Sequence, residues 1–456
     1  MKKTVYIDVT DFITWQGNFS GIQRVVYETG LRLAKSKSID LKYVYYSDKT
    51  RQFFSVNVDV FTEAQKSRQG NAQDSSNDEQ VLSARQKAMQ FAKSTYRRLP
   101  DSIGRPAKRT YNYTRHHAGL FLNEYVRPAT RFLKNRSTPR EHVPGIYADH
   151  MTPLEITSAD TFLILGQGWY GPKWYDPSLI RELAKLKREK RFALGILIHD
   201  TIPVSHPEFY SGGFTGVYDE FLFEGLIIAD QVFTVSQSTR RDVEAYCADN
   251  YIKTPPITVV QLGDNFADAV PVKPYSVREK EEFVLAVGSF EIRKNYIVLY
   301  QAVKQAQLMG ITLPKIVIVG RQGFLSRDLD QLIESDYSVK DTFVHFSHIS
   351  DGELAWLYKN AMFTVYPSVY EGWGLPIAES LYNGKFCISS NTSSMPEVGG
   401  KLVDYVSPYD VVGWMEAIHK YASNKKLLRE KTTAVEAHAK APYSWDDTAK
   451  TIEKAL

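Results

Sequence analysis

Two glutamates, Glu371 and Glu379, are separated by seven residues in the segment EGWGLPIAE. Gly372 and Gly374 between them let the backbone approach a ligand closely, because glycine has no Cβ. Pro376 marks the first turn of a new helix, whose unpaired N–H groups attract an anion. Carboxylates tolerate such a neighbour when hydroxyl groups donate hydrogen bonds to them. The spacing therefore predicts a pocket for a phosphate and for sugar or ribose hydroxyls. The alternative is a helix cap in which the acidic side chains interact favourably with the helix dipole and bind no ligand.

Two adjacent cations, Arg293 and Lys294, follow the apolar run FVLAVGS in the segment VGSFEIRKN. Cations at the beginning of a helix oppose the positive end of its dipole, and the arrangement becomes favourable when an anion lies between them. The pair therefore indicates a diphosphate site at the carboxyl end of a strand. A solvated basic turn is the alternative interpretation.

Three further segments place candidate residues at the ends of expected strands. His199 and Asp200 end the strongly apolar run FALGILIHD, and such a position faces the ligand crevice of an open α/β sheet. A core or capping histidine is the alternative there. Gly21 and Arg24 begin a helix in GNFSGIQRVV, where a plain strand-to-helix connection explains the glycine almost equally well. Trp169 closes the glycine-rich turn GQGW after the run TFLILG.

Short apolar runs rich in β-branched residues alternate with helical patterns along most of the chain, as in parallel βαβ units. Strands that are apolar on both faces belong in sheets covered by helices on both sides. The expected strands are TVYIDVT, LKYVYY, TFLILG, FALGILIHD, QVFTVS and ITVVQLG in a first group, and FVLAVGS, KIVIVG, TFVHFS, MFTVYPS and KFCISSN in a second. We predict an α/β protein of two tandem Rossmann-like, doubly wound domains with a ligand site in the cleft between them.

A proline-punctuated polar stretch at 268–282 separates the two groups of strands. It predicts a first domain over 1–270 and a second domain over 271–440. An insertion at about 62–140 breaks the alternation of strands and helices in the first domain.

This insertion carries a large excess of positive over negative charge. Residues 81–140 contain 14 Lys and Arg residues against Asp101 and Glu124, although the whole chain of 456 residues has a net charge of only +4. With its interspersed aromatic residues, the segment could bind an anionic membrane surface. An oligomerisation or packing element with a solvated basic face fits equally well. Nucleic-acid binding is disfavoured, because no recognised nucleic-acid module accompanies the charge.

Cys247 and Cys387 are too few and too far apart for a disulfide framework, which favours a reducing cytoplasm. The first residues, MKKTVYIDVTDF, lack the apolar core of a signal peptide, and no run approaches the ~18–20 apolar residues of a membrane span. The sequence therefore predicts a cytoplasmic protein, either soluble or peripheral on the inner face of the cytoplasmic membrane.

The segment EGWGLPIAE resembles the E-x7-E signature of the retaining glycosyltransferases of family 4, which have the GT-B fold. The resemblance implies that Glu371 contacts the hydroxyls of the donor hexose and that Glu379 binds the nucleotide ribose. Trp373 stands where the family more often has phenylalanine. The residues expected to bind the donor are Glu379, Gly372, Trp373, Gly374, Leu375 and Ser289.

The same resemblance covers nearly all of 150–456 and also residues 1–45. It implies that 441–456 is a terminal helix that crosses back to the first domain. The family segment that matches VGSFEIRKN ends in Arg-Lys-Asn, and its basic pair neutralises the departing diphosphate. His199 and the aspartate after it resemble the His-Asp pair that approaches the donor sugar from the opposite domain. We therefore expect Glu371, Arg293, Lys294 and His199 to be catalytic, and Gly21, Arg24, Asp200 and Trp169 to lie on the acceptor or phosphate side.

The resemblance implies transfer of a hexose with retention of anomeric configuration. No residue is an obvious covalent nucleophile, which favours a front-face route in which the leaving phosphate helps to deprotonate the acceptor hydroxyl. Arg293, Lys294 and backbone N–H groups would stabilise the leaving group, so we expect neither a metal nor another cofactor.

The context FEIRKN is similar to mannosyltransferases that use GDP-mannose, which makes GDP-mannose the first expected donor. UDP- or dTDP-linked sugars, including rhamnose, remain open. The implied acceptor is a saccharide or lipid-linked chain of a bacterial surface polysaccharide such as lipopolysaccharide. A Rossmann oxidoreductase is disfavoured, because GNFSGIQ does not supply G-x-G-x-x-G. A non-catalytic GT-B scaffold is the remaining alternative, and the intact glutamates and basic pair argue against it.

Overall fold

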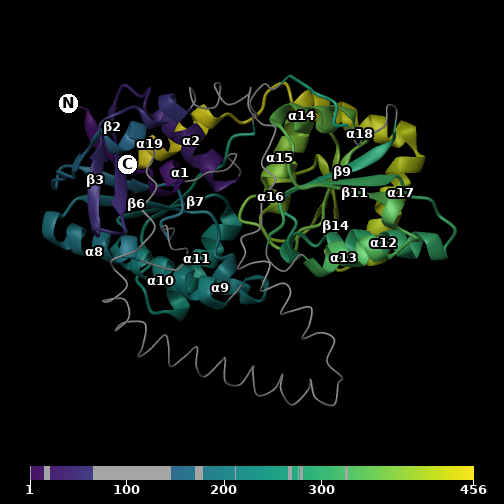
Figure 1. Cartoon of the computed structure of the whole chain (residues 1–456), viewed down its shortest axis with the longest axis horizontal. Helices are drawn as coiled ribbons and strands as arrows, with labels where there is room; N and C mark the ends of the chain where they lie inside the picture. Colours follow the sequence, from purple (N-terminus) through teal and green to yellow (C-terminus); the bar gives the residue numbers. More distant parts are fainter. Residues whose placement is uncertain are drawn as a thin grey trace, which may run out of the picture. The chain divides into compact units, whose positions relative to one another are not determined.

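The computed structural model describes residues 2–14, 21–64, 145–169, 178–210, 212–264, 270–275, 277, 281–323 and 327–456. The basic segment 81–140, with the membrane, packing and oligomerisation roles expected for it, lies outside the described residues. Two β-sheets organise the described part of the chain, the first built from β1 to β8 and the second from β9 to β14 (Figure 1).

The first sheet has the strand order β4-β3-β2-β1-β5-β6-β7-β8. Its strands from β2 to β8 in this order are parallel, and β3 and β4 extend one edge by antiparallel pairing. The chain reverses its direction of growth between β1 and β5, and the loops after these strands therefore open a crevice at the carboxyl edge. The bounds are β1 (Lys3–Asp8), β2 (Ile39–Ser47), β3 (Gln52–Val56), β4 (Met151–Pro153), β5 (Thr161–Ile164), β6 (Ala193–Ile198), β7 (Gln231–Thr234) and β8 (Ile257–Val259).

Helices cover both faces of the first sheet (Figure 1). On one face, α8 (Ser178–Lys190) and α10 (Gly212–Ile228) contact each other and close a core in which Phe221 and Leu183 meet Phe162. Each fully buried side chain of this size contributes roughly 1.5–3 kcal/mol. α2 (Ile22–Leu33) lies on the other face. The other helices of this half are α1 (Thr10–Thr14), α7 (Gly145–Ala148), α9 (Ile202–Ser205), the 3-10 helix η2 (Pro207–Phe209) and α11 (Gln237–Asp249).

The second sheet is parallel throughout and has the order β11-β10-β9-β12-β13-β14. This is the order of a doubly wound Rossmann sheet, whose switch point here lies between β9 and β12. The loop after β9 contains the basic pair Arg293 and Lys294, and the loop after β12 contains Glu371. The bounds are β9 (Phe283–Val287), β10 (Lys315–Val319), β11 (Phe343–Phe346), β12 (Thr364–Tyr366), β13 (Cys387–Ser390) and β14 (Val403–Val406).

The helices around the second sheet close a core on the packed helices α12 and α17, in which Trp414, Leu299 and Phe363 are fully buried. The elements are the 3-10 helix η3 (Ile292–Lys294), α12 (Tyr296–Leu308), α13 (Arg327–Ser335), the 3-10 helix η4 (Lys340–Thr342), α14 (Asp351–Asn360), α15 (Leu375–Tyr382), α16 (Met395–Gly399), α17 (Val411–Ser423) and α18 (Lys425–His438).

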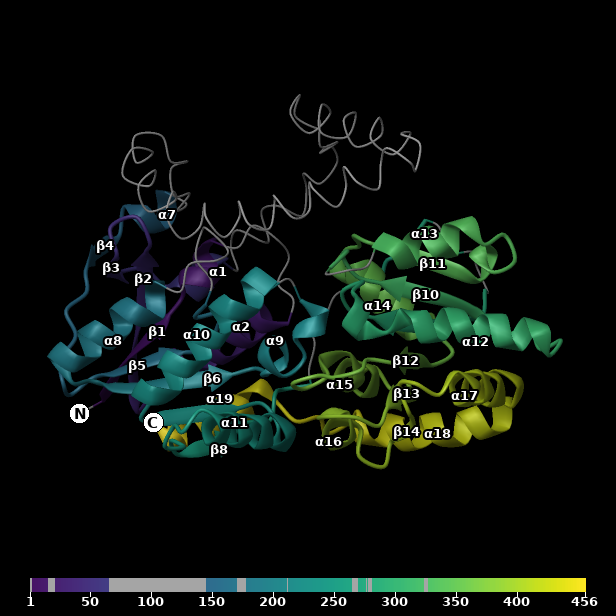
Figure 2. The same cartoon turned by 90° about the horizontal axis from the view of Figure 1, so that it is seen from below.

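The last helix, α19 (Trp445–Ala455), returns to the first sheet (Figure 2). It packs against α2, and Ile452 and Trp445 are buried there. Trp445 lies so close to Gly263 that a Cβ at this glycine would come within 2.6 Å of the tryptophan. The contact fastens the end of the chain to the loop after β8.

The two sheets confirm the predicted α/β class with two doubly wound halves, and the structure corrects several details. The expected strand at 4–10 ends at Asp8, because Asp8 Oδ1 accepts hydrogen bonds from Thr10 N at 3.1 Å and Thr10 Oγ1 at 2.6 Å and turns the chain into α1. The sequence patterns do not predict β3, β4 or β14. These strands lie in the outer parts of their sheets, where β3 pairs antiparallel with β2 and β4, and β14 pairs with β13, so tertiary pairing selects them.

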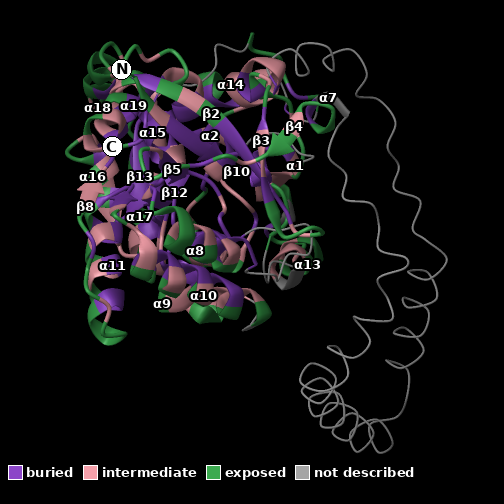
Figure 3. Cartoon of the chain, turned by 90° about the vertical axis from the view of Figure 1, so that its left-hand side faces the viewer, coloured by how far each residue is buried: buried purple, intermediate pink, exposed green. Residues whose placement is uncertain are grey.

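Figure 3 shows that the strands are buried while the surrounding helices expose their outward faces. Cys247 and Cys387 are buried free thiols. Among the described helices, none combines the length and the apolar character that crossing a bilayer requires.

Candidate active site

Glu371 lies in the turn after β12, and four side chains converge on its buried carboxylate. The donors are Arg293 Nη1 at 2.7 Å, Lys294 Nζ at 2.6 Å, Tyr366 Oη at 2.7 Å and Ser368 Oγ at 2.6 Å. Burial alone would raise the pKa of Glu371, but the two cations outweigh it and hold the pKa far below its usual range. Glu371 is therefore a carboxylate at neutral pH.

Arg293 and Lys294 lie on η3, one residue before α12 begins, and not in the helix itself as the sequence suggested. Asn295 makes this separation: it adopts a left-handed conformation with φ 58°, and its side chain donates to the carbonyls of Pro367 at 3.0 Å and Pro408 at 2.7 Å. The loop after β9 is thereby fixed to the loop after β12, and both cations reach the switch point.

Each cation has a second partner. Arg293 Nη2 lies 2.8 Å from Glu291 Oε1, and Lys294 Nζ donates to Tyr366 Oη at 2.8 Å. Burial lowers the pKa of Lys294, against the attraction of Glu371. The cluster is nearly neutral, because Glu291 and Glu371 balance the two cations. The attraction between these charges offsets the cost of removing them from water.

The glycine turn has two different structural causes. Gly374 has φ 115°, a conformation that strongly favours glycine, and it caps α15. Gly372 lies against the first sheet, where an added Cβ would come 1.9 Å from the carbonyl oxygen of His199. The sequence predicts that Gly372 allows a ligand to approach, and the structure shows that it allows the loop after β6 to approach. Ser394 Oγ fixes the turn by donating to the carbonyls of Glu371 at 2.9 Å and Trp373 at 2.6 Å.

Glu379 projects from α15 and is also buried. Its carboxylate accepts hydrogen bonds from Tyr358 Oη at 2.7 Å and from Arg24 Nη1 at 3.1 Å. Burial raises the pKa of Glu379, and Arg24 partly offsets this effect. Arg24 belongs to α2, beside the first sheet, so this ion pair joins the two halves. It also neutralises the glutamate to which the family resemblance gives the ribose.

His199 and Asp200 follow β6 and face the same region. His199 is buried, and its Nε2 lies 2.8 Å from the carbonyl oxygen of Leu165, to which it must donate. Burial lowers the pKa of His199 to about 4, so the ring is neutral and its Nε2 proton is engaged. Asp200 Oδ1 accepts from Ile202 N at 2.9 Å. Burial, partly offset by Arg293, raises the pKa of Asp200 to about 6.

One cavity of about 580 Å³ joins these groups, and residues of both sheets line it. Every candidate residue from the sequence lines this cavity: Gly21, Arg24, Trp169, His199, Asp200, Ser289, Arg293, Lys294, Glu371, Gly372, Trp373, Gly374, Leu375 and Glu379. The structure brings all of them together, and the role of each one stays a prediction.

Five further residues at the site were not predicted from the sequence. Tyr366 and Ser368 bind Glu371, Tyr358 binds Glu379, and Tyr210 and Phe214 line the cavity. Tyr366 and Ser368 flank the end of an expected strand, which is a usable signal in an open α/β sheet. The other three lie far from any motif in the sequence, and only the fold brings them to the site.

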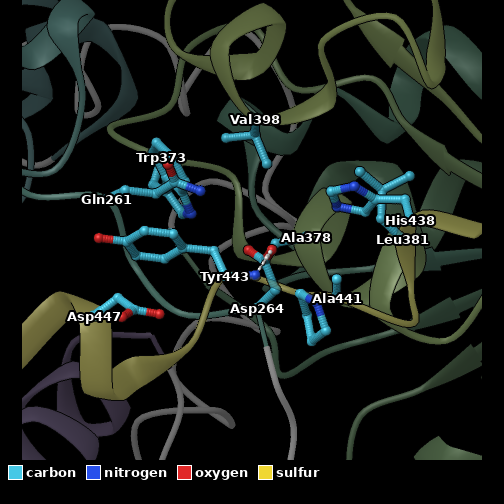
Figure 4. Close-up of a pocket in the computed structure, with 11 residues that line it drawn as sticks. Gln261, Asp264, Trp373, Ala378, Leu381, Val398, His438, Ala441, Tyr443 and Asp447 are labelled. Atoms are coloured by element: carbon cyan, nitrogen blue, oxygen red, sulfur yellow. Dashed lines mark hydrogen bonds between the residues drawn. The ribbon is translucent and has the colours of Figure 1, made fainter.

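Trp373 also lines a smaller pocket of about 290 Å³, drawn in Figure 4. Among the described residues, no acceptor meets its buried Nε1–H group. In this pocket Tyr443 N donates to Asp264 Oδ2 at 3.2 Å, and Asp264 N donates to the Tyr443 carbonyl at 2.9 Å. Burial raises the pKa of Asp264 to about 6. These bonds hold the returning chain just before α19.

The described residues contain no group of three His, Cys, Asp or Glu side chains arranged to hold a metal ion. The sequence has two aspartates with Asp-x-Asp spacing at 328–330, a spacing that could present carboxylates to a metal ion. The carboxylate of Asp330, however, lies 3.3 Å from His345 Nδ1 and does not line the cavity.

Residues 272–439 match the sequence profile of the family described as glycosyl transferases group 1. The matched range contains the whole second sheet, from β9 to β14, together with Arg293, Lys294, Glu371 and Glu379.

Curated relatives match over parts of the chain. The serotype-specific mannosyltransferase WbdA of Escherichia coli is 29% identical over 264 residues, which are 55% of this chain and 32% of WbdA. The O-antigen chain mannosyltransferase B of Escherichia coli is 26% identical over 294 residues, which are 62% of this chain and 72% of that protein. The chain thus spans about a third of the length of WbdA.

Two solved structures align with the whole chain. Sucrose-phosphate synthase from Thermosynechococcus elongatus has a TM-score of 0.58 at 16% identity and covers 100% of this chain and 98% of its own. HepE of Anabaena, solved with UDP and glucose, has a TM-score of 0.56 at 12% identity, and the alignment covers 100% of this chain and 99% of HepE. These likenesses confirm the predicted GT-B fold.

Proposed function

We propose that this chain, whose residues 272–439 match the glycosyl transferases group 1 family, moves a hexose from a nucleotide sugar to an acceptor hydroxyl. The observation that carries the proposal is the arrangement around Glu371: a buried carboxylate and two buried cations meet at the switch point of the second sheet. Nucleotides bind at such a switch point in doubly wound folds.

The donor would lie along the second sheet. Its diphosphate would bind beside Arg293, Lys294 and the first N–H groups of α15, where cations and a helix N-terminus attract negative charge. Its hexose hydroxyls would donate to Glu371, and its ribose hydroxyls to Glu379. Since Arg24 and Tyr358 bind Glu379 in this structure, ribose binding would exchange at least one of these contacts.

The proposed reaction retains the anomeric configuration. The bond between the anomeric carbon and the diphosphate oxygen breaks, the bond to the acceptor oxygen forms on the same face, and the acceptor proton passes to the leaving diphosphate. His199 is a poor general base, because its Nε2 carries a proton that the Leu165 carbonyl accepts. Arg293 and Lys294 would stabilise the leaving group, so the step requires no metal.

We propose GDP-mannose as the donor and a bacterial surface polysaccharide, at the inner face of the cytoplasmic membrane, as the acceptor. The FEIRKN context supports this choice, and so do the relatives WbdA and O-antigen chain mannosyltransferase B, which are named mannosyltransferases. A UDP- or dTDP-linked sugar such as dTDP-rhamnose is the alternative of the same fold.

The test is a panel of GDP-mannose, UDP-glucose, UDP-N-acetylglucosamine, dTDP-rhamnose and ADP-glucose. Thermal unfolding of the protein is measured with each compound, and slow hydrolysis of the sugar is measured by release of the nucleoside diphosphate. Stabilisation and hydrolysis with GDP-mannose alone are the expected result. A protein that none of these donors stabilises and that hydrolyses none of them is not a nucleotide-sugar transferase. Selective response to another donor would replace GDP-mannose.

Glu379→Ala should weaken binding of the parent nucleoside diphosphate about 10–100-fold, because hydrogen bonds to a charged group contribute about 1.5–3 kcal/mol. Calorimetric titration measures the change. The control ligand is the 2′,3′-dideoxy form of the same nucleotide, which lacks the hydroxyls assigned to Glu379. The variant and the unchanged protein should bind this control equally. An equal loss of affinity for both nucleotides would contradict the ribose assignment.

A further inference from the structure

Four aromatic side chains form one wall of the cavity: Trp169, Tyr210, Phe214 and Tyr218. We call this set the aromatic wall. Its rings are contiguous, because Tyr210 and Phe214 stack with centroids 5.3 Å apart, Phe214 and Tyr218 lie 6.2 Å apart, and Tyr218 meets Trp169 edge-on at 4.7 Å. Trp169 and Tyr218 are buried, whereas Tyr210 and Phe214 are only partly buried and form the surface that a ligand would touch.

All four rings come from the first sheet and its helices, after β5, at the end of η2 and on α10. The donor groups Arg293, Lys294, Glu371 and Glu379 come from the second half of the chain. The aromatic wall therefore belongs to the part of the cavity that the proposed donor leaves unused.

Polar groups border the wall on the side of the donor site. Asp200 lines the cavity, and the hydroxyl of Tyr218 donates to its backbone carbonyl. The carboxylate of Asp200 interacts electrostatically with Arg293 and Glu371, and the phenol of Tyr210 interacts with the same two groups. Gln167 also lines the cavity, in the turn that leads to Trp169. The wall thus combines an apolar ring surface with a carboxylate next to the reacting centre.

This combination fits the face of a pyranose ring. The C–H groups of one pyranose face carry partial positive charge and pack well on the negative face of an aromatic ring. The hydroxyls at the edge of the same sugar need hydrogen-bond acceptors, and Asp200 supplies one. A phosphate would be repelled by the Asp200 carboxylate. A bare lipid tail would cover this carboxylate without donating a hydrogen bond to the oxygen that Ile202 N leaves unoccupied.

We propose that the aromatic wall is the acceptor subsite and that the acceptor group is a pyranose residue, stacked on Phe214 and Tyr210 with a hydroxyl directed to Asp200. This inference rests on the proposed transferase function, and it assigns the substrate class of the second half-site.

The experiment follows the partition of the donor between acceptor and water. Initial rates of transfer and of donor hydrolysis are measured with the donor found above. The probes are methyl α-pyranosides of mannose, glucose, galactose and N-acetylglucosamine, compared with glycerol and octyl phosphate. At least one pyranoside should be a better acceptor than glycerol and octyl phosphate. If the donor is hydrolysed and no pyranoside accepts the sugar, or if glycerol or octyl phosphate serves as well, the subsite assignment is wrong.

Phe214→Ala should raise the KM of the preferred pyranoside, and lower the ratio of transfer to hydrolysis, by about tenfold or more. Phe214→Tyr should restore most of the ratio, because the ring is kept. The matched control is Phe223→Ala on the same helix, since Phe223 is 36% exposed and does not line the cavity. A Phe214→Ala protein with an unchanged ratio, or with transfer and hydrolysis reduced equally, would overturn the inference. Absence of hydrolysis in the unchanged protein would instead count against the transferase function.

Discussion

Lys294→Met is expected to lower the rate of sugar transfer about 10²–10³-fold, with a much smaller change in the KM of the donor. The ammonium is buried and already donates to Glu371 at 2.6 Å and to Tyr366 at 2.8 Å, so its position is fixed before a donor arrives. A preorganised cation acts most strongly on the charge that develops as the glycosidic bond breaks. Methionine approximates the apolar stem of the side chain and removes the ammonium together with its N–H donors.

The fold should survive this substitution, because Glu371 keeps its ion pair with Arg293 at 2.7 Å. Lys304→Met is the matched control: it removes a cation of α12 that pairs with Asp336 at 2.9 Å, away from the cavity. Steady-state kinetics at saturating donor should show unchanged turnover for the control. Wild-type turnover in the Lys294 variant would mean that the ammonium does not act on the leaving group.

The sequence predicted the parts of the site that lie in short continuous segments at strand ends. EGWGLPIAE encodes a strand end, a turn and a helix start, and VGSFEIRKN places two cations after the neighbouring strand. Parallel strands bring such segments to one edge of a sheet, so local patterns suffice to predict that they meet. The left-handed Asn295, which separates the basic pair from α12, has no comparably clear signal in the sequence.

What the sequence did not predict depends on contacts between distant segments. Arg24 could be recognised as a cation at a helix start, but its pairing with Glu379 requires the two halves to be packed together. The glycine at position 372 can be explained locally by the close approach of a ligand. Its neighbour in the structure is the His199 carbonyl of the other half. The aromatic wall likewise joins residues of three elements, and a single aromatic residue in a helical pattern is usually a core residue.

Glu371→Gln is expected to abolish detectable transfer and also to destabilise the protein by about 3–5 kcal/mol at pH 7, because it leaves two buried cations without their shared anion. Glutamine keeps an oxygen that can accept from Tyr366 and Ser368, so the loss reports the charge and not the hydrogen bonds. Urea unfolding followed by tryptophan fluorescence measures the change. The double variant Glu371→Gln/Lys294→Met should recover part of the stability, since Arg293 retains Glu291 at 2.8 Å, and it should remain inactive.

The unchanged protein and the Glu371→Gln variant should differ in how their stability depends on pH. The pKa of Glu371 is lowered in the folded state, so the unfolded chain binds more protons near the unfolded pKa of about 4.3, and stability rises with pH there. The contribution of Glu371 is therefore fully present at pH 7 and decreases as the pH falls below about 4.3. The stability difference between the unchanged protein and Glu371→Gln should shrink over that range. A difference that is equal at pH 7 and pH 3.5 would show that the carboxylate charge does not hold the two cations in place.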